Sequence, residues 1–239
     1  MSLLVLVSGL LMVQLWDRHS VQQQVDKSKA LAADLAADHA QALQRGIDRA
    51  LSATYAMAAL VRQGGGEVLD FDGVATEMLP FYPGIAALGL APNGIICCVS
   101  PLAGNEKSLG FNQLTDIAQN REARLARDTG KLTLAGPLQL AQGGLGVVGR
   151  LPIYLTAADG ERRFWGFSYA TLRFPQALDA ARLPVLSERG YAYALWRKVP
   201  ETGERQQIET WNAQALIDPV ERTLALPNGA WTLSVAPLA

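Results

Sequence analysis

The stretch from Asp17 to Arg62 constrains the fold most, because it contains no proline and a single glycine, Gly46. Ala, Leu, Gln, Asp and Arg dominate it, and most of these residues favour helices. Apolar residues recur at helical spacing along one face: Val21, Val25, Leu31, Leu35, Leu43, Ile47, Leu51, Met57 and Val61. The pattern predicts one helix over residues 17–63, which would be roughly 70 Å long. A helix of that length is a coiled-coil stalk or the spine of a domain packed along it.

The segment before this helix, residues 1–16, carries no charged side chain and reads MSLLVLVSGLLMVQLW. A membrane-spanning helix needs about 20 apolar residues, so the run is a few residues short. No Lys or Arg precedes it and no small-residue cleavage site follows it, which argues against a cleavable signal peptide. We interpret the segment as a truncated transmembrane helix with Trp16 at the membrane interface. The alternative is a buried helix of a soluble protein.

Composition excludes several classes of protein. Of the 239 residues, 49% are hydrophobic and 18% charged, which is too apolar for a disordered chain. The net charge of −1 argues against a nucleic-acid partner, because binding to phosphates usually requires a basic excess. Two His and two Cys leave little material for a metal centre. We therefore expect neither a metal site nor a cofactor.

After Gly64-Gly65-Gly66, the pattern alternates between short strands and helices. Pro92-Asn93-Gly94 joins two apolar runs and predicts a hairpin. The expected helices are 73–80, 111–129 and 174–183, and the expected strands are 85–91, 95–99, 131–141, 145–156, 162–172, 190–198, 205–211, 221–226 and 230–236. The prediction is an α+β fold in which a long N-terminal helix precedes two PAS-like antiparallel-sheet modules. The expected segments are 1–16 (membrane helix), 17–63 (stalk or spine helix), 64–172 (first module) and 173–239 (second module).

No catalytic set is visible in the globular part. His19 and His39 both fall in the long helix, about 30 Å apart at helical pitch, so they cannot share a metal within one chain. The run Gly144–Gly149 matches the spacing G-x-G-x-x-G, but it leads into a strand with Pro152 rather than opening a helix. Close packing of backbones in a sheet is the simpler interpretation.

Cys97 and Cys98 are adjacent on an apolar run that we expect to be a strand. Neighbouring side chains of a strand point to opposite faces, so we expect no bridge between the two cysteines. At least one of them should behave as a small buried hydrophobe.

A series of short motifs between residues 80 and 172 resembles the CHASE domain. The motifs are Tyr82-Pro83-Gly84-Ile85, Pro101–Glu106, Leu109-Gly110, Asn120–Ala123, Gly136–Leu140, Gly146–Val148 and Leu151–Tyr154. CHASE domains are the extracytoplasmic sensors of many transmembrane histidine kinases and diguanylate cyclases. The resemblance implies a long helix, a membrane-distal PAS-like module with the ligand pocket, and a membrane-proximal PAS-like module.

The resemblance also implies a cellular setting. The chain would be the periplasmic part of an inner-membrane receptor and would act as a homodimer. It would have no enzymatic activity of its own, and a cytoplasmic diguanylate cyclase or histidine kinase would provide the output. A second membrane anchor and that output domain would follow Ala239.

The same resemblance suggests where a small molecule binds. The family's polar sheet position before the Leu-Pro pair falls on Arg150, and the family's helix carboxylate has its nearest match in Asp116. A guanidinium pairs with carboxylates or phosphates through two hydrogen bonds, so the hypothesis is an anionic small ligand. The expected apolar lining is Leu88, Leu138, Leu140 and Val148. The alternatives are that Arg150 pairs with Asp116 or faces solvent, and that the apolar residues are ordinary core.

Three other functions remain open at this stage, and one of them is an enzyme in its own right, although no acid–base set is visible in the globular part. A double-Cache sensor also combines a long helix with two PAS-like modules, but it would show an aromatic-rich amino-acid clamp with an Asp. A membrane-anchored binding or scaffold protein would have no output domain.

Overall fold

The computed structural model describes residues 2–115 and 120–238, except for the side chains of residues 2–15 and 17–22. It divides into two compact units. One comprises residues 1–40, 183–223 and 232–239, and the other comprises residues 41–182 and 224–231. The four segments expected from the sequence remain a prediction.

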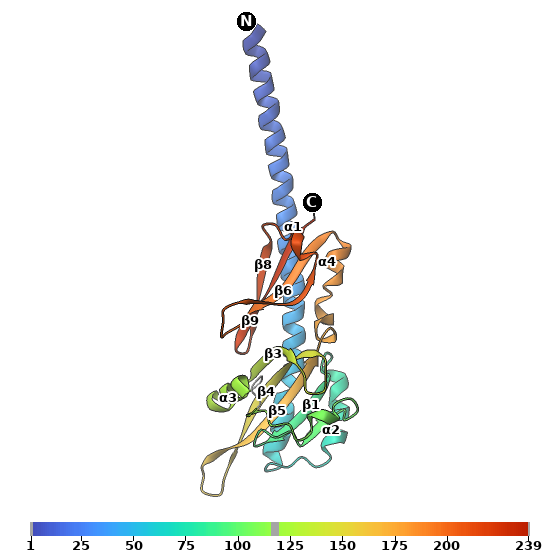
Figure 1. Ribbon diagram of the computed structural model, residues 1–239, viewed down its shortest axis with the longest axis vertical. Coiled ribbons are helices and arrows are strands. Elements are labelled where there is room, and N and C mark those ends of the chain that lie inside the picture. The colour runs from blue at the N-terminus through green and yellow to red at the C-terminus, as the bar shows by residue number, and fades with distance from the viewer. Residues whose placement is uncertain (1, 116–119, 239) are drawn as a thin grey trace. The chain divides into compact units, whose positions relative to one another are not determined.

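Helix α1 (Ser2–Gln63) runs without interruption through the stretch that lacks helix breakers (Figure 1). It ends where expected: the amides of Gly64 and Gly66 donate to the carbonyls of Leu60 and Val61, and Gly66 has a φ of 109°. Glycine adopts this left-handed conformation without steric cost. In the described part of the chain, no helix is both long and apolar enough to cross a membrane.

The first sheet belongs to the unit that contains residues 41–182. Its strands are β1 (Ala87–Pro92), β2 (Cys98–Ser100), β3 (Thr133–Gln139), β4 (Leu145–Thr156) and β5 (Arg162–Arg173). Their spatial order is β2-β1-β5-β4-β3, and neighbouring strands are antiparallel. The helical segments of this unit are α2 (Phe71–Met78), η1 (Leu79–Phe81), η2 (Glu106–Ser108), α3 (Asn120–Thr129) and η3 (Gln176–Ala181).

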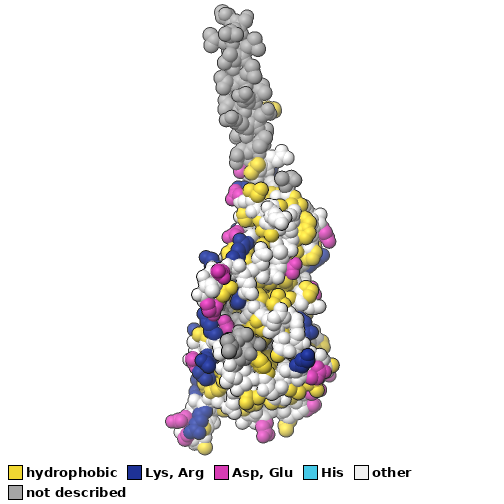
Figure 2. Space-filling model, viewed as in Figure 1, with side chains coloured by type: hydrophobic (Ala, Val, Ile, Leu, Met, Phe, Trp, Pro, Cys, Tyr) yellow, Lys and Arg dark blue, Asp and Glu magenta, His cyan; other side chains and the backbone are white. Residues whose placement is uncertain are grey.

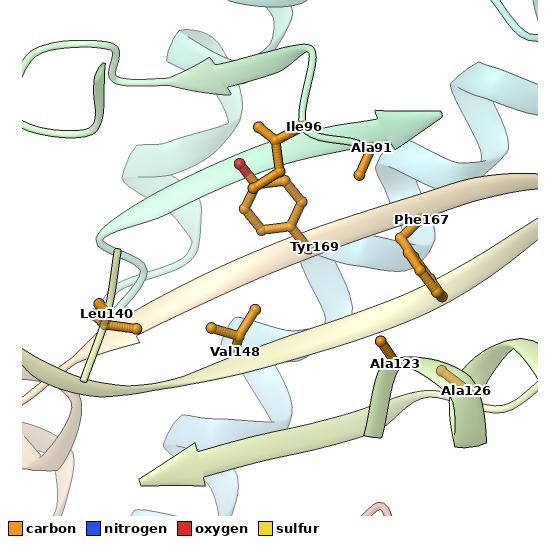
Figure 3. Close-up of a cluster of buried hydrophobic side chains, with 8 residues drawn as sticks. All are labelled: Ala91, Ile96, Ala123, Ala126, Leu140, Val148, Phe167 and Tyr169. Carbon is orange, nitrogen blue, oxygen red and sulfur yellow. The ribbon is translucent and has the colours of Figure 1, made fainter. Parts of the chain in front are cut away.

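The two faces of this sheet are both covered. On one face, a β-carbon added to Gly149 would lie 2.1 Å from Cδ2 of Leu51, so α1 packs directly on β4. On the other face, Ala123 and Ala126 of α3 join a buried cluster with Val148, Phe167 and Tyr169 (Figure 3). Because both faces are buried, β4 and β5 are buried along most of their length rather than at alternate residues.

The second sheet contains β6 (Tyr191–Lys198), β7 (Arg205–Trp211), β8 (Val220–Leu226) and β9 (Gly229–Pro237) in the order β7-β6-β9-β8. The short helices α4 (Pro184–Glu188) and η4 (Ala213–Ala215) accompany it. Strands β7 and β8 are largely exposed or half-buried, whereas β6 and β9 carry the core. The α+β class, the long N-terminal helix and the two antiparallel sheets are thus as the sequence predicted.

Two expected helices and one expected strand differ in the structure. Of the helix expected over 111–129, the described residues form α3 from Asn120 onward, whereas residues 111–115 are not helical, because Phe111 and Gln113 pair with the hairpin through their backbones. The helix expected over 174–183 is replaced by η3 and α4, since Arg182 adopts a left-handed conformation between them. The strand expected over 95–99 is reduced to Cys98–Ser100.

Candidate functional site

A small, partly open cavity lies on the face of the first sheet opposite α1. Its volume is about 20 Å³, room for about one water molecule. The lining combines five apolar residues with six polar or charged ones: Ile96, Phe111, Leu140, Ala141, Val148, Ser108, Gln113, Gln142, Arg150, Tyr169 and Thr171.

Strand register brings the polar groups of the cavity together. In β4 and β5, Arg150 lies opposite Tyr169 and Val148 lies opposite Thr171. Residues directly opposite each other in antiparallel strands share a face, as do residues two apart along one strand. The four side chains therefore point to the same side of the sheet, and Figure 3 shows two of them, Val148 and Tyr169.

Gly89 makes room for the ring of Tyr169. In β1 it lies opposite Tyr169, and a β-carbon added at Gly89 would lie 2.4 Å from both Cζ and Oη of that tyrosine. The same added carbon would lie 2.5 Å from the carbonyl oxygen of Cys98. The phenol and the backbone of β2 therefore both pack closely against the one position in β1 that has no side chain.

Arg150 is the charged group of the cavity, and its side chain is 0% exposed. Its Nε donates a hydrogen bond to Oε1 of Gln113. Gln113 is itself held in place, because its backbone amide donates to the carbonyl of Gly94 at 2.8 Å. The site thus offers a guanidinium in a water-excluded environment, where electrostatic interactions are stronger than in water.

The phenol of Tyr169 is the second notable polar group. Its hydroxyl is buried and has no hydrogen-bond partner among the described residues. Burial raises the pKa of Tyr169 above its usual value, and neither the neighbouring Ser108 hydroxyl nor the charge of Arg150 offsets that effect. At neutral pH the phenol is therefore a neutral group that can donate to a ligand or a water molecule.

The loop between β3 and β4 closes one side of the cavity. The amide of Leu140 donates to the carbonyl of Gly144 at 2.9 Å, and the amide of Gly143 donates to the carbonyl of Leu140 at 2.8 Å. The following glycines allow close packing: a β-carbon at Gly146 would lie 2.5 Å from the carbonyl oxygen of Leu172. The interpretation of the G-x-G-x-x-G spacing as backbone packing within a sheet is confirmed.

The structure brings together three of the six residues expected at the site: Arg150, Leu140 and Val148 all line the cavity. Leu138 packs against the neighbouring apolar cluster without lining the cavity. Leu88 requires a correction, because it pairs with Ala170 in the register that places it on the α1 face. Asp116 lies outside the described residues.

Sequence reasoning missed Gln113, Tyr169, Ser108 and Thr171. The alternation of Phe167, Tyr169 and Thr171 in β5 does indicate a shared face. That signal cannot identify the face opposite α1, because the choice depends on the register between β4 and β5. Gln113 falls in a segment that we expected to be helical, so its position on the cavity wall was not foreseen.

The cysteine pair also requires a correction. Cys97 precedes β2 and is exposed, Cys98 is half-buried, and their sulfur atoms are 2.7 Å apart. The two side chains therefore do not point to opposite faces, because only Cys98 belongs to the strand.

A larger groove lies beside α2, with a volume of about 780 Å³. It is an open surface hollow, and one of its carboxylates, Asp70, already accepts a hydrogen bond from the amide of Gly73 at 3.1 Å. Elsewhere, Figure 2 shows basic and acidic side chains interspersed over the visible face. Within the described residues, no three His, Cys, Asp or Glu side chains are grouped as metal ligands would be.

Comparison with solved structures gives one related fold and two weaker matches. An extracellular ligand binding receptor from Desulfohalobium retbaense is 13% identical with a TM-score of 0.65, and the match covers 84% of this chain and 39% of that one. This chain thus spans well under half the length of that receptor structure. Two structures of the Vibrio cholerae LuxQ periplasmic domain are 14% and 13% identical with TM-scores of 0.42 and 0.37. Each of these two matches covers 89% of this chain. The first covers 98% of the LuxQ chain and the second covers 99%.

Comparison of sequences gives a family. No curated protein matches the chain. Residues 91–204 match the family model of the CHASE domain, a range that contains β2 to β6 and the last two residues of β1. The resemblance predicted from the sequence motifs is confirmed: this chain resembles the CHASE extracytoplasmic sensor domain.

Proposed function

We propose that this chain is the periplasmic sensor of a transmembrane receptor and that it binds a small anionic molecule at the Arg150 cavity. The observation that carries the proposal is the fully buried guanidinium on the wall of a cavity within the CHASE match. The fold shared with a protein described as an extracellular ligand binding receptor supports the same assignment.

The chemistry of the cavity favours an anion whose oxygen atoms accept hydrogen bonds. A guanidinium presents its N–H groups in a planar fork that matches a carboxylate or a phosphate. The neutral hydroxyl of Tyr169 adds a donor on the neighbouring strand. Val148, Leu140 and Ile96 supply an apolar wall for the remainder of the ligand.

The size of the cavity indicates how binding produces a signal. A space of about 20 Å³ is too small for an organic acid, so the covering segments must move when one binds. The segment Phe111–Gln113 and the loop Leu140–Gly144 are the movable walls, because both are connections between regular elements. A ligand that binds only the open form shifts the population towards that form.

Helix α1 is the proposed route for the signal. It packs on the first sheet through residues such as Leu51 and contributes residues to both units. In a homodimer, a change in the packing of α1 would pass to an inner-membrane anchor formed by residues 1–16. A cytoplasmic diguanylate cyclase or histidine kinase would then provide the output.

A thermal-shift and calorimetric titration tests the ligand class. Mono- and dicarboxylic acids and phosphate esters would be titrated into wild type, Arg150→Met and Arg163→Gln. The first variant keeps the volume of the buried side chain without its charge, and the second removes an exposed arginine that pairs with Asp159. A ligand at about 100 times its Kd stabilises the folded state by about 2.7 kcal/mol.

We expect that stabilisation in wild type and Arg163→Gln, and its loss in Arg150→Met. Equal shifts in all three proteins would exclude Arg150 as the anchor. If Arg150→Met does not fold, Arg150→Lys keeps the charge without the planar fork, and it should weaken binding at least tenfold.

The coding sequence after residue 239 tests the receptor assignment separately. A second apolar segment followed by a cyclase or kinase domain is the expected result. A stop codon directly after this position would contradict the proposal and favour a binding or scaffold protein.

A further inference from the structure

The vicinal cysteines occupy a position suited to covalent chemistry. The sulfur atoms of Cys97 and Cys98 are 2.7 Å apart, compared with about 2.05 Å in a disulfide bond. Both thiols are free, and Cys97 is exposed at the surface. The pair is therefore accessible to a dissolved oxidant and already close to bonding distance.

The local backbone explains why neighbouring side chains converge. The amide of Cys97 donates to the carbonyl of Leu90 at 3.1 Å, while Cys98 is the first residue of β2 and lies opposite the same Leu90. The chain changes from irregular to extended conformation between the two cysteines. The alternation of side chains that a continuous strand would impose does not apply there.

The pair is also connected to the cavity. The carbonyl oxygen of Cys98 and the phenol of Tyr169 approach the same position in β1, Gly89, from which a β-carbon would lie 2.5 and 2.4 Å away respectively. A ring closed through both cysteines changes the backbone angles of Cys98, and the resulting rotation of the Cys98–Val99 peptide moves an oxygen that packs beside the phenol. Through Tyr169, such a rotation reaches a wall of the Arg150 cavity.

We propose that Cys97 and Cys98 form a reversible vicinal disulfide by exchange with a small-molecule disulfide, and that its formation alters the environment of Tyr169. One cysteine thiolate attacks a sulfur of the small disulfide, and one thiol of that molecule leaves. The second cysteine then attacks the sulfur of the mixed disulfide and releases the second thiol. In total, two cysteine thiols lose two protons and two electrons, and one small disulfide becomes two thiols.

The order of the two attacks follows from the surroundings of Cys97. Although Cys97 is exposed as a residue, partial burial of its thiol, together with the hydrogen bond to the adjacent Cys98 thiol, raises the pKa of Cys97 to about 12. Since the thiolate is the nucleophile, Cys98 makes the first attack and Cys97 resolves the mixed disulfide.

The disulfide should be easily reduced. Cα atoms of adjacent residues are about 3.8 Å apart across a trans peptide, whereas disulfides usually join Cα atoms at least about 4.4 Å apart. Strained disulfides have more oxidising potentials and exchange readily. This bond would therefore respond to changes in redox conditions rather than serve as a permanent crosslink.

The test uses the full chain, oxidised glutathione and intact-mass spectrometry. Wild type should lose the mass of two hydrogens and retain no glutathione, and dithiothreitol should reverse the change. Cys97→Ser keeps the attacking thiol but lacks the resolving one, so it should retain one glutathione adduct. A wild-type protein that keeps both thiols, retains an adduct or forms crosslinked dimers would overturn the proposal.

Near-ultraviolet circular dichroism tests the connection to Tyr169. The tyrosine signal should differ between oxidised and reduced wild type, and the difference should be at least halved in Tyr169→Phe. Identical oxidised and reduced spectra of the wild type, with the disulfide shown by mass, would overturn the coupling to the cavity.

Discussion

The two sheets of this protein differ in how far their buried polar side chains are hydrogen-bonded. The first sheet has both faces covered and holds several buried polar side chains, among them Arg150, Ser168 and Thr171. The hydroxyls of Ser168 and Tyr169 are buried without hydrogen-bond partners in the described part of the chain. Such groups are costly for folding and are typical of sites that a ligand or water completes.

In the second sheet, the buried polar side chain at the centre, Ser234, has hydrogen-bond partners on the neighbouring strands. Ser234 of β9 is buried, accepts a hydrogen bond from Nε1 of Trp196 at 2.9 Å, and donates to Oε1 of Glu221 at 2.9 Å. Arg205 stacks on the ring of Trp196, with its guanidinium carbon 4.0 Å from the ring centroid. This network links side chains of all four strands of the second sheet. The difference favours a structural role for the second sheet and a binding role for the first.

The largest expected difference in stability is between alanine substitutions at two glycines, one in each sheet. Gly89→Ala should destabilise the protein by about 3 kcal/mol, because the new β-carbon overlaps the Tyr169 phenol and the Cys98 carbonyl. Gly229→Ala, in β9, should change stability by less than about 0.5 kcal/mol, since no atom lies within 4 Å of its added β-carbon. Urea unfolding measures both. A Gly89→Ala protein as stable as Gly229→Ala would show that β1 and Tyr169 are loosely packed.

A smaller difference in stability is expected between variants that remove one hydroxyl from each sheet. Ser234→Ala leaves Trp196 Nε1 and the Glu221 carboxylate without their shared partner, and it should cost about 1–3 kcal/mol in urea unfolding. Tyr169→Phe removes a hydroxyl that has no hydrogen-bond partner among the residues that the structure describes, so its effect should lie between zero and a gain of about 1 kcal/mol. Equal losses in the two variants would remove the distinction between a completed network and an incomplete site.

The smallest effect concerns alkaline pH. Folding raises the pKa of Tyr169, so the phenol ionises first in the unfolded state. The contribution of the neutral phenol to the free energy of unfolding should be fully present below about pH 10. Above that pH it should fall, by at most about 1.4 kcal/mol per pH unit. Tyr169→Phe should show a shallower decline than wild type in urea midpoints measured across this range. Parallel curves for the two proteins would mean that the phenol is not buried in solution.

In the second sheet, Tyr193 provides the matching variant for this experiment. Burial, followed by the charge of Glu209, also raises its pKa, so Tyr193→Phe should flatten the same decline. A variant that steepens the decline would show that the charge on the phenol is tolerated in the folded state.

Much of the architecture could be predicted from local patterns. The stretch without helix breakers specified α1, and Asn-Gly between apolar runs located the hairpins. Motif position singled out Arg150, and Leu140 and Val148 were expected as apolar lining; all three line the cavity, and their role in binding stays a prediction. The long-range features could not be predicted in this way. Leu88 and Val148 are equally apolar and buried, yet they lie on opposite faces of one sheet.

The sequence by itself determined the elements whose cause is local: the periodicity of α1, the glycines that end it and the turns between strands. It also carried the resemblance to the CHASE domain, because the CHASE motifs are contiguous segments. Only the tertiary structure decided which residues meet at the cavity. Arg150, Tyr169, Gly89 and Gln113 come from four separate segments, and their meeting depends on strand register. A shift of one residue would exchange the two faces of a strand and leave every local preference unchanged.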